Sequence, residues 1–494
     1  MTPEPISRRR ALQLGLLGAG TLTIGVVGLG TQGWPPFGTS ARGDGATASP
    51  DADAADRGAS LIEPELLASA AGILDLDLLV AESDVVVAGR RVRMLTYNGT
   101  VPGPTLHLRP GDRLRVRLAN GLDSATNLHT HGLVVSAEGS SDNPFVRIDP
   151  GDAFEYTIDL PEDHPTGVFW YHPHHHGTVA DQVFGGLYGA IVVDTEPWDA
   201  AEARILVVSD VTFADGRVAA VSRPERMHGR AGRTVLVNGQ VAPELTVPAG
   251  STQRLLVINA CTSRYLDLDP GSGRLRVRGF DGGQFPEPVS GDRVLLAPGN
   301  RADLELDVPA GGAVLTARAH DRGAVEMGMG GVVDEADATL LTVRAGTGVA
   351  APLPPVRAGV ARDLRSVTVD RARTLDLTMG MGRGMGRMSF LIDGKEFDAG
   401  RVDQQVRLGD VEEWTVRNSS TMDHPFHLHV WPMQLVRAGG ETVELVDRRD
   451  VVDVPAGQEV TVRIAFDTFP GTTVYHCHVL DHEDLGMMGT IEAG

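Results

Sequence analysis

A thiol, three imidazoles and a thioether lie close together near the C-terminal end of the chain. His476, Cys477 and His478 are consecutive, and His482 and Met487 follow within ten residues of the cysteine. Soft sulfur combined with imidazole selects copper, and two histidines with one cysteine and a weak axial methionine make a blue electron-transfer centre. These residues therefore predict a copper site.

The same segment predicts a second metal centre on the opposite side of the chain. Residues 474–478 are typical of a buried strand, in which successive side chains point to opposite faces. Cys477 is therefore expected on one face, while His476 and His478 are expected on the other. One strand would serve two centres.

Pairs of histidines separated by one residue recur elsewhere in the sequence. Because the chain has 16 His among 494 residues, chance predicts about half of one such pair. Zinc sites usually have Cys-x₂-Cys or His-Glu-x-x-His spacing, which is absent here, so the pairs favour copper. They are His129 with His131, His172 with His174, His427 with His429, and His476 with His478.

These motifs make the sequence resemble the three-domain multicopper oxidases of the bacterial laccase and cuprous oxidase type. The resemblance covers nearly all of the chain after residue 64, and the copper motifs occur in the family's order. It implies four copper ions, one of type 1, one of type 2 and two forming a type 3 pair. The implied ligands are His424, Cys477, His482 and axial Met487 for type 1, His129 and His427 for type 2, and His131, His172, His174, His429, His476 and His478 for the type 3 pair.

The resemblance also implies an activity. A laccase-like enzyme would oxidise phenolic or similar small aromatic donors one electron at a time and reduce O₂ to water with four electrons. Electrons would enter at an exposed edge of His424 or His482 and pass from Cys477 to the histidines beside it. By the same resemblance, Asp142 and Glu483 are expected to relay protons, and the alternative for each is a solvated loop charge.

Two other classes fit the sequence less well. A copper nitrite reductase lacks the His-Cys-His arrangement at residues 476–478. A non-catalytic family member that acts in cell division would have lost copper ligands, whereas all twelve are present in this sequence.

A methionine-rich segment leaves the electron donor open. Met379, Met381, Met385 and Met388 are interleaved with glycines, a pattern poorly suited to a packed core. Thioethers are soft ligands for Cu(I), so the segment is a candidate Cu(I) loop, and a flexible loop without metal is the alternative. Cuprous oxidases of the family carry a much longer insert there. A phenol oxidase is therefore favoured over a cuprous or other metal-ion oxidase of copper homeostasis.

Short alternating runs and frequent turn residues predict an all-β protein. The chain has 60 Gly and 30 Pro, and its strand-like runs are bounded by turn dipeptides. A segment leading from Gly to Asn recurs at residues 110–120, 249–259 and 408–418, which indicates three related sandwiches. Together with the resemblance, this predicts three consecutive cupredoxin-like Greek-key β-sandwich domains, at residues 64–197, 198–345 and 356–494.

A second repeat assigns the copper to two of these domains. The segments that end at His172, His320 and His476 match one another, but the middle copy keeps one histidine and loses its partner. The first and third domains would bind copper, with the three-copper cluster between them. The second domain would be a copper-free spacer and a wall on the substrate side.

The N-terminus predicts export rather than fold. Ser7-Arg8-Arg9-Arg10 precedes a mildly apolar run at residues 12–30, which matches a twin-arginine signal. Residues 1–48 would then be signal peptide and linker. The twin-arginine machinery would deliver the protein to the periplasm, the cell envelope or the exterior, and an uncleaved membrane anchor is the alternative.

Net charge and cysteine count restrict the partners. The formal charge is −21, which would repel phosphates, so a nucleic acid partner is excluded and small aromatic or cationic donors are favoured. Cys261 and Cys477 are the only cysteines. If Cys477 binds copper, no disulfide is possible. We expect a monomer.

Overall fold

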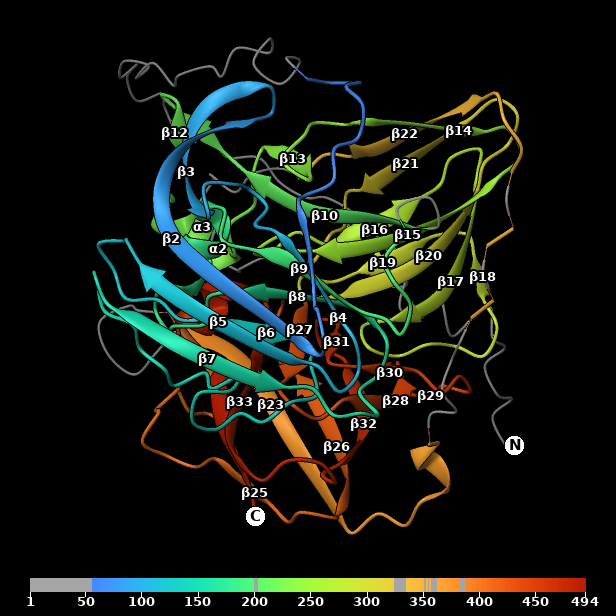
Figure 1. Ribbon diagram of the computed structural model, residues 1–494. Helices are drawn as coiled ribbons and strands as arrows, with labels where there is room; N and C mark the ends of the chain where they lie inside the picture. The colour runs from blue at the N-terminus through green and yellow to red at the C-terminus, as the bar shows by residue number, and fades with distance from the viewer. Residues whose placement is uncertain are drawn as a thin grey trace, which may run out of the picture.

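The computed structural model describes residues 56–199, 203–323, 335–350, 352–353, 355–356, 362–381 and 388–494. The predicted signal peptide and linker, residues 1–48, lie outside this range, as does Met385. Within the described residues, no helix has the length and apolar character needed to cross a membrane. Strands dominate, which confirms the all-β class. Figure 1 shows three groups of strands, blue to teal, green to yellow, and orange to red.

The first sheet pair encloses one apolar core. Its strands are β1 (Leu66–Ala68), β2 (Ile73–Val87), β3 (Arg90–Tyr97), β4 (Thr105–Leu108), β5 (Arg113–Asn120), β6 (His129–His131), β7 (Ala153–Asp159), β8 (Gly167–His172) and β9 (Gly189–Val193), with β11 (Phe213–Ala214) and β12 (Arg217–Val218) from later in the chain. The sheet orders are β1-β4-β9-β8-β6 and β11-β12-β3-β2-β5-β7. Leu114 and Val116, which alternate with exposed residues along β5, meet Phe169 and Ile191 of the facing sheet in one cluster.

The second sheet pair repeats this arrangement. Its strands are β10 (Ala203–Val211), β13 (Thr234–Val237), β14 (Glu244–Pro248), β15 (Thr252–Asn259), β16 (Leu266–Asp269), β17 (Arg274–Phe280), β18 (Val289–Gly291), β19 (Val294–Leu296), β20 (Arg301–Asp307), β21 (Ala313–Arg318) and β22 (Ala338–Gly346). The orders are β13-β10-β15-β20-β17-β18 and β14-β22-β21-β16-β19. Cys261 is buried in the core between these sheets and is a free thiol.

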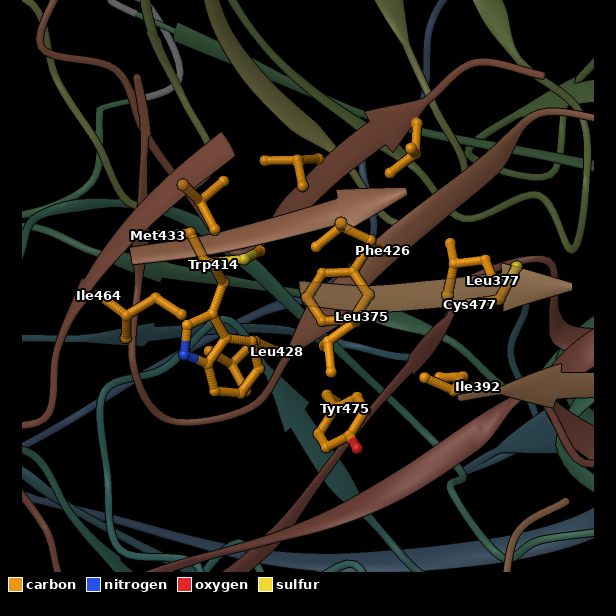
Figure 2. Packing of buried hydrophobic residues seen from close by; sticks show 14 of the residues in the cluster. Leu375, Leu377, Ile392, Trp414, Phe426, Leu428, Met433, Ile464, Tyr475 and Cys477 are labelled. Carbon is orange, nitrogen blue, oxygen red and sulfur yellow. The ribbon is translucent and has the colours of Figure 1, made fainter. Parts of the chain in front are cut away.

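The third sheet pair contains most of the predicted ligands. Its strands are β23 (Arg371–Met381), β24 (Met388–Ile392), β25 (Gln404–Val406), β26 (Val411–Asn418), β27 (His424–Leu428), β28 (Met433–Ala438), β29 (Glu441–Thr442), β30 (Arg448–Arg449), β31 (Val451–Val454), β32 (Glu459–Ala465), β33 (Gly471–Cys477) and β34 (Met488–Ala493). One sheet has the order β24-β23-β26-β32-β28-β29, with β30 beside β28, and the other has the order β25-β34-β33-β27-β31. Figure 2 shows Cys477 in the core between them, with Leu377, Phe426 and Trp414.

The predicted repeat corresponds to one strand in each pair. The three Gly-to-Asn copies contain β5, β15 and β26. Each of these strands lies between a parallel neighbour, β2, β10 or β23, and an antiparallel one, β7, β20 or β32. This shared order confirms the cupredoxin-like sandwich class, while the domain boundaries stay a prediction. The hairpin of β11 and β12 crosses one predicted boundary, because β12 pairs with β3 of the first sheet pair.

Few helices are present among the described residues. They are α2 (Val179–Gly185), α3 (Arg223–His228), α4 (Leu480–Asp484) and a 3₁₀ turn, η2 (Leu364–Ser366). Helix α4 follows β33 directly and packs against both α2 and α3. It therefore connects the third sheet pair with segments of the other two.

The two ends of the methionine-rich segment lie on strands, and residues 382–387 between them lie outside the described residues. Met379 and Met381 lie on β23, and Met388 lies opposite Met381 at the start of β24. Met388 is buried in the apolar core of the third sheet pair, the third core, and Met379 packs against that core. The reason is the alternation of Leu375, Leu377 and Met379, which places all three on the apolar face of one strand. The expectation of a loop is therefore wrong for these two methionines.

Candidate metal centres

Strand pairing divides the predicted ligands into two groups. Strands β27 and β33 are antiparallel, with His427 opposite His476 and Phe426 opposite Cys477. Residues directly opposite each other point to the same face of a sheet, and the face alternates along each strand. His427 and His476 therefore share one face, whereas Cys477 lies on the other.

The sulfur cluster consists of His424, Cys477 and His482, all fully buried. His424 Nδ1 lies 3.3 Å from Cys477 Sγ and 3.3 Å from His482 Nδ1, and Sγ lies 3.9 Å from His482 Nδ1. Three donor atoms thus converge on one point. Soft sulfur with two imidazole nitrogens is the donor set that copper prefers.

Neighbouring groups fix these three donors. Ser420 Oγ lies 2.9 Å from His424 Nε2, which leaves Nδ1 directed toward the sulfur. The backbone N–H of Val479 donates to Cys477 Sγ at 3.4 Å, and the Phe390 ring stacks on His482 with a centroid separation of 4.5 Å. Such contacts around the sulfur tune the redox potential of a copper centre.

No exposed imidazole edge is found, contrary to the expectation from the sequence. His424 and His482 each have 0% exposure. Helix α3 packs against α4, and its Met227 joins the third core beside the cluster. An electron donor outside the protein therefore cannot touch either imidazole.

Met487 is buried beside the sulfur cluster. Its backbone carbonyl accepts a hydrogen bond from the Cys477 N–H at 3.0 Å, and its side chain belongs to the third core. Met488, the next residue, is also buried. The role of Met487 as axial ligand stays a prediction.

The histidine cluster contains the eight other predicted ligands. They form three groups, two of which share His131, and within each group the ligand atoms lie within 4.8 Å of one another. The tightest approach is between His476 Nε2 and the Nε2 atoms of His174, at 3.1 Å, and His429, at 3.3 Å. The groups are His129, His131 and His427; His131, His172 and His478; and His174, His429 and His476.

Several rings are fixed through one nitrogen and present the other to the cluster. Nδ1 of His172 contacts the Pro173 carbonyl at 2.8 Å, and Nδ1 of His427 contacts the Asp450 carbonyl at 2.8 Å. Among the described residues, Nε2 of both rings has no hydrogen-bond partner. A buried polar atom without a partner is costly, so these nitrogens fit a bound metal. A second contact that fixes the tautomer is typical of metal-binding histidines.

Burial keeps the imidazoles of His172, His174 and His424 neutral. It lowers the pKa of His172 to about 3, of His174 to about 4 and of His424 to about 3. Burial also raises the pKa of the Cys477 thiol. Metal ligands must be deprotonated, so the imidazoles are ready to bind whereas the thiol must release its proton.

Both predicted proton-relay carboxylates lie against the histidine cluster. Asp142 Oδ2 lies 2.9 Å from His129 Nδ1, and burial raises the Asp142 pKa to about 7. Glu483 Oε2 lies 3.1 Å from His476 Nδ1, and its Oε1 lies 3.5 Å from His174 Nε2. Each carboxylate is almost fully buried. The alternative of a solvated loop charge is therefore wrong for both.

Sequence reasoning missed a third carboxylate. Asp450 Oδ1 accepts a hydrogen bond from His131 Nε2 at 2.9 Å, while the Asp450 carbonyl accepts one from His427 Nδ1. Asp450 lies between β30 and β31, and no histidine or cysteine is close to it in the sequence. No spacing signal marks it, because only the folded chain brings it to His131.

Comparison with known proteins decides the family. Models described as multicopper oxidase match residues 80–197 and 367–494, the segments that contain all twelve predicted ligands. The chain belongs to the multicopper oxidases. It is a copper-dependent oxidoreductase that uses O₂ as electron acceptor, and a laccase-like activity is compatible with its relatives.

Relatives of this multicopper oxidase match along most of the chain. Multicopper oxidase mco of Staphylococcus aureus is 28% identical over 412 residues, covering 81% of this chain and 83% of the relative. A laccase of Bacillus subtilis is 27% identical, covering 80% and 89%. The solved multicopper oxidase of Campylobacter jejuni, described as a metallo-oxidase, superposes with a TM-score of 0.78 at 29% identity, covering 88% of this chain and 95% of its own.

Proposed function

We propose that this oxidase holds four copper ions, one in the sulfur cluster and three in the histidine cluster, and oxidises phenolic donors. One observation carries the proposal. Cys477 belongs to the sulfur cluster, while His476 and His478 on either side of it belong to the histidine cluster. A single tripeptide therefore links a donor set suited to one-electron transfer with one large enough for several metal ions.

The grouping of the side chains supports a division of the ligands. Two of the groups each contain three histidines, one with His476 and the other with His478, which suits the two ions of a type 3 pair, and His129 and His427 meet in the remaining group. The proposed ligands are His424, Cys477, His482 and axial Met487 for type 1, His129 and His427 for type 2, and His131, His172, His174, His429, His476 and His478 for type 3.

Bound copper would supply the one-electron redox chemistry that links donor oxidation to O₂ reduction. The chain supplies the arrangement. Cys477 and its two neighbours give a covalent route between the clusters. Burial of every ligand excludes water, and the contacts of Ser420 and Val479 hold the sulfur cluster in one geometry.

Asp142 and Glu483 are proposed to hold the protons that O₂ reduction consumes. Each is buried within hydrogen-bond distance of a proposed ligand. Asp142 also accepts the Thr130 N–H at 2.8 Å, which fixes the carboxylate. Geometry of this kind allows a side chain to move a proton to a reacting group.

A phenolic donor is favoured by the packing of the methionines. Met388 and Met379 contribute to the third core, so their thioethers are used in packing rather than free for Cu(I). The net charge of −21 also favours neutral or cationic organic donors over anionic ones. A laccase among the relatives is consistent with this choice.

The segment before the described residues is proposed to be a twin-arginine signal, and the exported protein a monomer. The double variant Arg8→Lys, Arg9→Lys tests the export route. The twin-arginine pathway requires the pair, so the variant should remain in the cytoplasm as precursor. Export at the normal level would reject the proposal.

The donor is tested by steady-state kinetics on the fully copper-loaded protein. A phenol, a bulky dye, Cu(I) and Fe(II) are compared by kcat/KM, with O₂ uptake measured for each. We expect the phenol and the dye to exceed both metal ions. A preference for Cu(I) or Fe(II) would assign a metal-ion oxidase, and no O₂ uptake with any donor would reject the oxidase.

A methionine variant separates the two donor classes. Leu conserves the volume of Met, so the core should tolerate the change. Loss of the thioethers should leave phenol oxidation and the KM for Cu(I) unchanged if they only pack. A severalfold rise in the KM for Cu(I) alone would identify a Cu(I) site. The variant combines Met379→Leu, Met381→Leu, Met385→Leu and Met388→Leu.

A further inference from the structure

A buried arginine of the second sheet pair reaches the histidine cluster. Arg301, the first residue of β20, has 0% exposure. Its Nη1 and Nη2 donate to the two carboxylate oxygens of Asp450 at 2.6 Å and 2.7 Å, and its Nε donates to the Val168 carbonyl on β8 at 3.2 Å. One side chain therefore joins all three sheet pairs.

Asp450, held by the two-pronged fork of the Arg301 guanidinium, contacts proposed ligands from two sheet pairs. Asp450 Oδ1 accepts from His131 of β6, and the Asp450 carbonyl accepts from His427 of β27. These bonds leave His131 Nδ1 and His427 Nε2 without hydrogen-bond partners among the described residues. The orientation of the two rings toward the cluster thus depends on the position of Asp450.

Asp281 binds the backbone of both Arg301 and Asp450. Its carboxylate accepts the backbone N–H groups of Arg301 at 2.9 Å, Asp450 at 3.1 Å and Val451 at 3.2 Å. It also lies 3.4 Å from Arg301 Nη1. The start of β20 and the segment before β31 are therefore tied to the same carboxylate, so the second and third sheet pairs cannot shift without breaking these bonds.

Two glycines allow close packing here, Gly132 against Arg301 and Asp450, and Gly299 against His478. A Cβ on Gly132 would overlap Arg301 Nη2 and lie 2.7 Å from Asp450 Oδ2, and a Cβ on Gly299 would lie 2.8 Å from the His478 ring. Both glycines have positive φ, +86° and +87°, a conformation that favours glycine. The turn before β20 therefore packs directly on the histidine cluster.

We propose that Arg301 is a positioning residue for the histidine cluster, and that the copper-free second sheet pair completes that cluster through it. The fork orients Asp450, which in turn orients His131 and His427 for metal. The inference rests on the proposed role of these histidines. A structural clamp without effect on metal binding is the competing explanation.

The test compares two substitutions at Arg301 with a matched control. Arg301→Gln removes the charge and the fork, whereas Arg301→Lys keeps the charge as a single point donor. The control, Arg264→Gln, breaks a buried pair with Asp210 inside the second sheet pair, where Arg264 Nε lies 3.0 Å from the carboxylate. This pair contacts none of the proposed ligands.

Three measurements are made on each protein: the melting temperature without copper, the copper retained against a graded chelator, and the type 2 and blue copper signals. Groups that orient metal-binding histidines typically contribute 10- to 100-fold in affinity, so Arg301→Gln should weaken retention by the histidine cluster about 10- to 100-fold. The blue absorption should persist. Arg301→Lys should recover part of the loss.

The outcomes are distinguishable. Both Gln variants should melt at lower temperature without copper, but only Arg301→Gln should lose copper from the histidine cluster. If Arg301→Gln retains copper as tightly as the unmodified protein, or loses no more than Arg264→Gln, the proposal is overturned and Arg301 is a clamp. If Arg301→Gln does not fold, Arg301→Lys decides by the same comparison. Failure of the unmodified protein to bind copper at these histidines would instead reject the proposed function.

Discussion

The sulfur cluster and the histidine cluster use the same strand but differ in how they are built. Every residue of the sulfur cluster comes from the third sheet pair and helix α4, between residues 424 and 482. The histidine cluster takes His129 and His172 from the first sheet pair, His427 from the third, and support from Arg301 of the second. The residues of one site come from a single sandwich and the helix that follows it, whereas those of the other come from two sandwiches, with Arg301 of the remaining one contacting Asp450 beside it.

The electrostatic surroundings differ in the same way. Ser420 and Phe390, which contact the rings of the sulfur cluster, carry no charge, and the charges of Asp423 and Arg322 shift the pKa of His424 in opposite directions. The histidine cluster is surrounded by Asp142, Asp450 and Glu483. Burial raises the pKa of Glu483, but His476 and His174 outweigh it and lower that pKa below its usual range. The first setting suits electron transfer, whereas the second suits chemistry that consumes protons.

The largest effect is expected from Cys477→Ser, which separates the two clusters. A hydroxyl cannot replace the thiolate as a soft ligand, so the blue absorption and oxidase turnover should both fall to background. The histidine cluster should keep its copper, because its ligands are unchanged. Absorption spectra, steady-state O₂ uptake and copper content measure these effects.

The other cysteine provides the control. Cys261 is equally buried but lies in the second core, away from both clusters. Cys261→Ala should keep the colour and the turnover and cost about 1 to 2 kcal/mol of stability through the cavity it leaves. A Cys477→Ser protein that stays blue would show that the thiolate is not the ligand.

His429→Ala should give the opposite pattern. His429 contacts His476 and stacks on His129 at a centroid separation of 4.0 Å, but it contacts no member of the sulfur cluster among its described contacts. The protein should remain blue and accept electrons from a donor, yet fail to reduce O₂. Anaerobic bleaching followed by exposure to air separates these two steps. Simultaneous loss of colour and O₂ reduction would contradict the proposed division of ligands.

The difference between the clusters also explains what could be predicted from sequence. The Gly-to-Asn repeat predicts the three sandwiches because its copies form β5, β15 and β26, which hold the same position in the three sheet pairs. The His-Cys-His tripeptide predicts two centres because a strand alternates its faces. These features are local, so chain order and spacing are enough to find them.

Features that depend on assembly leave no such signal. Asp450 and Arg301 are 149 residues apart in sequence and form their ion pair only when the sheet pairs meet. The packing of Met227 of α3 against the third core likewise joins segments that are far apart in the sequence. The strand positions of Met379 and Met388 are also set by assembly, through the pairing of β23 with β24 and β26.

Glu483→Gln tests whether a carboxylate is needed at the histidine cluster. Gln keeps the size of Glu and one acceptor oxygen but cannot take up and release a proton. Positioned acid–base groups typically contribute 10²- to 10⁴-fold, so O₂ reduction should slow by about 100-fold or more while reduction of the blue centre by the donor is unchanged. Stopped-flow spectroscopy resolves the two half-reactions.

The adjacent carboxylate is the matched control for that variant. Asp484 Oδ1 and Oδ2 accept the N–H groups of Gly177 and Ala180 at 2.7 Å and 2.8 Å, at the start of α2. Asp484→Asn should cost about 1 kcal/mol of stability and leave O₂ reduction near normal. Equal slowing in both variants would mean that Glu483 acts through the structure of α4 rather than through its proton.

The smallest effect is expected from Met487→Leu, which sharpens the description of the sulfur cluster. Removing a weak axial donor destabilises the oxidised copper more than the reduced one, so the potential of the blue centre should rise. Leu conserves the volume, and the change should cost less than about 1.5 kcal/mol of stability. Met488→Leu, at an equally buried position on β34, is the control and should leave the potential unchanged. Redox titration of both variants decides the assignment, because a shift in Met488→Leu alone would make Met488 the axial partner, and no shift in either would leave the copper without a methionine ligand.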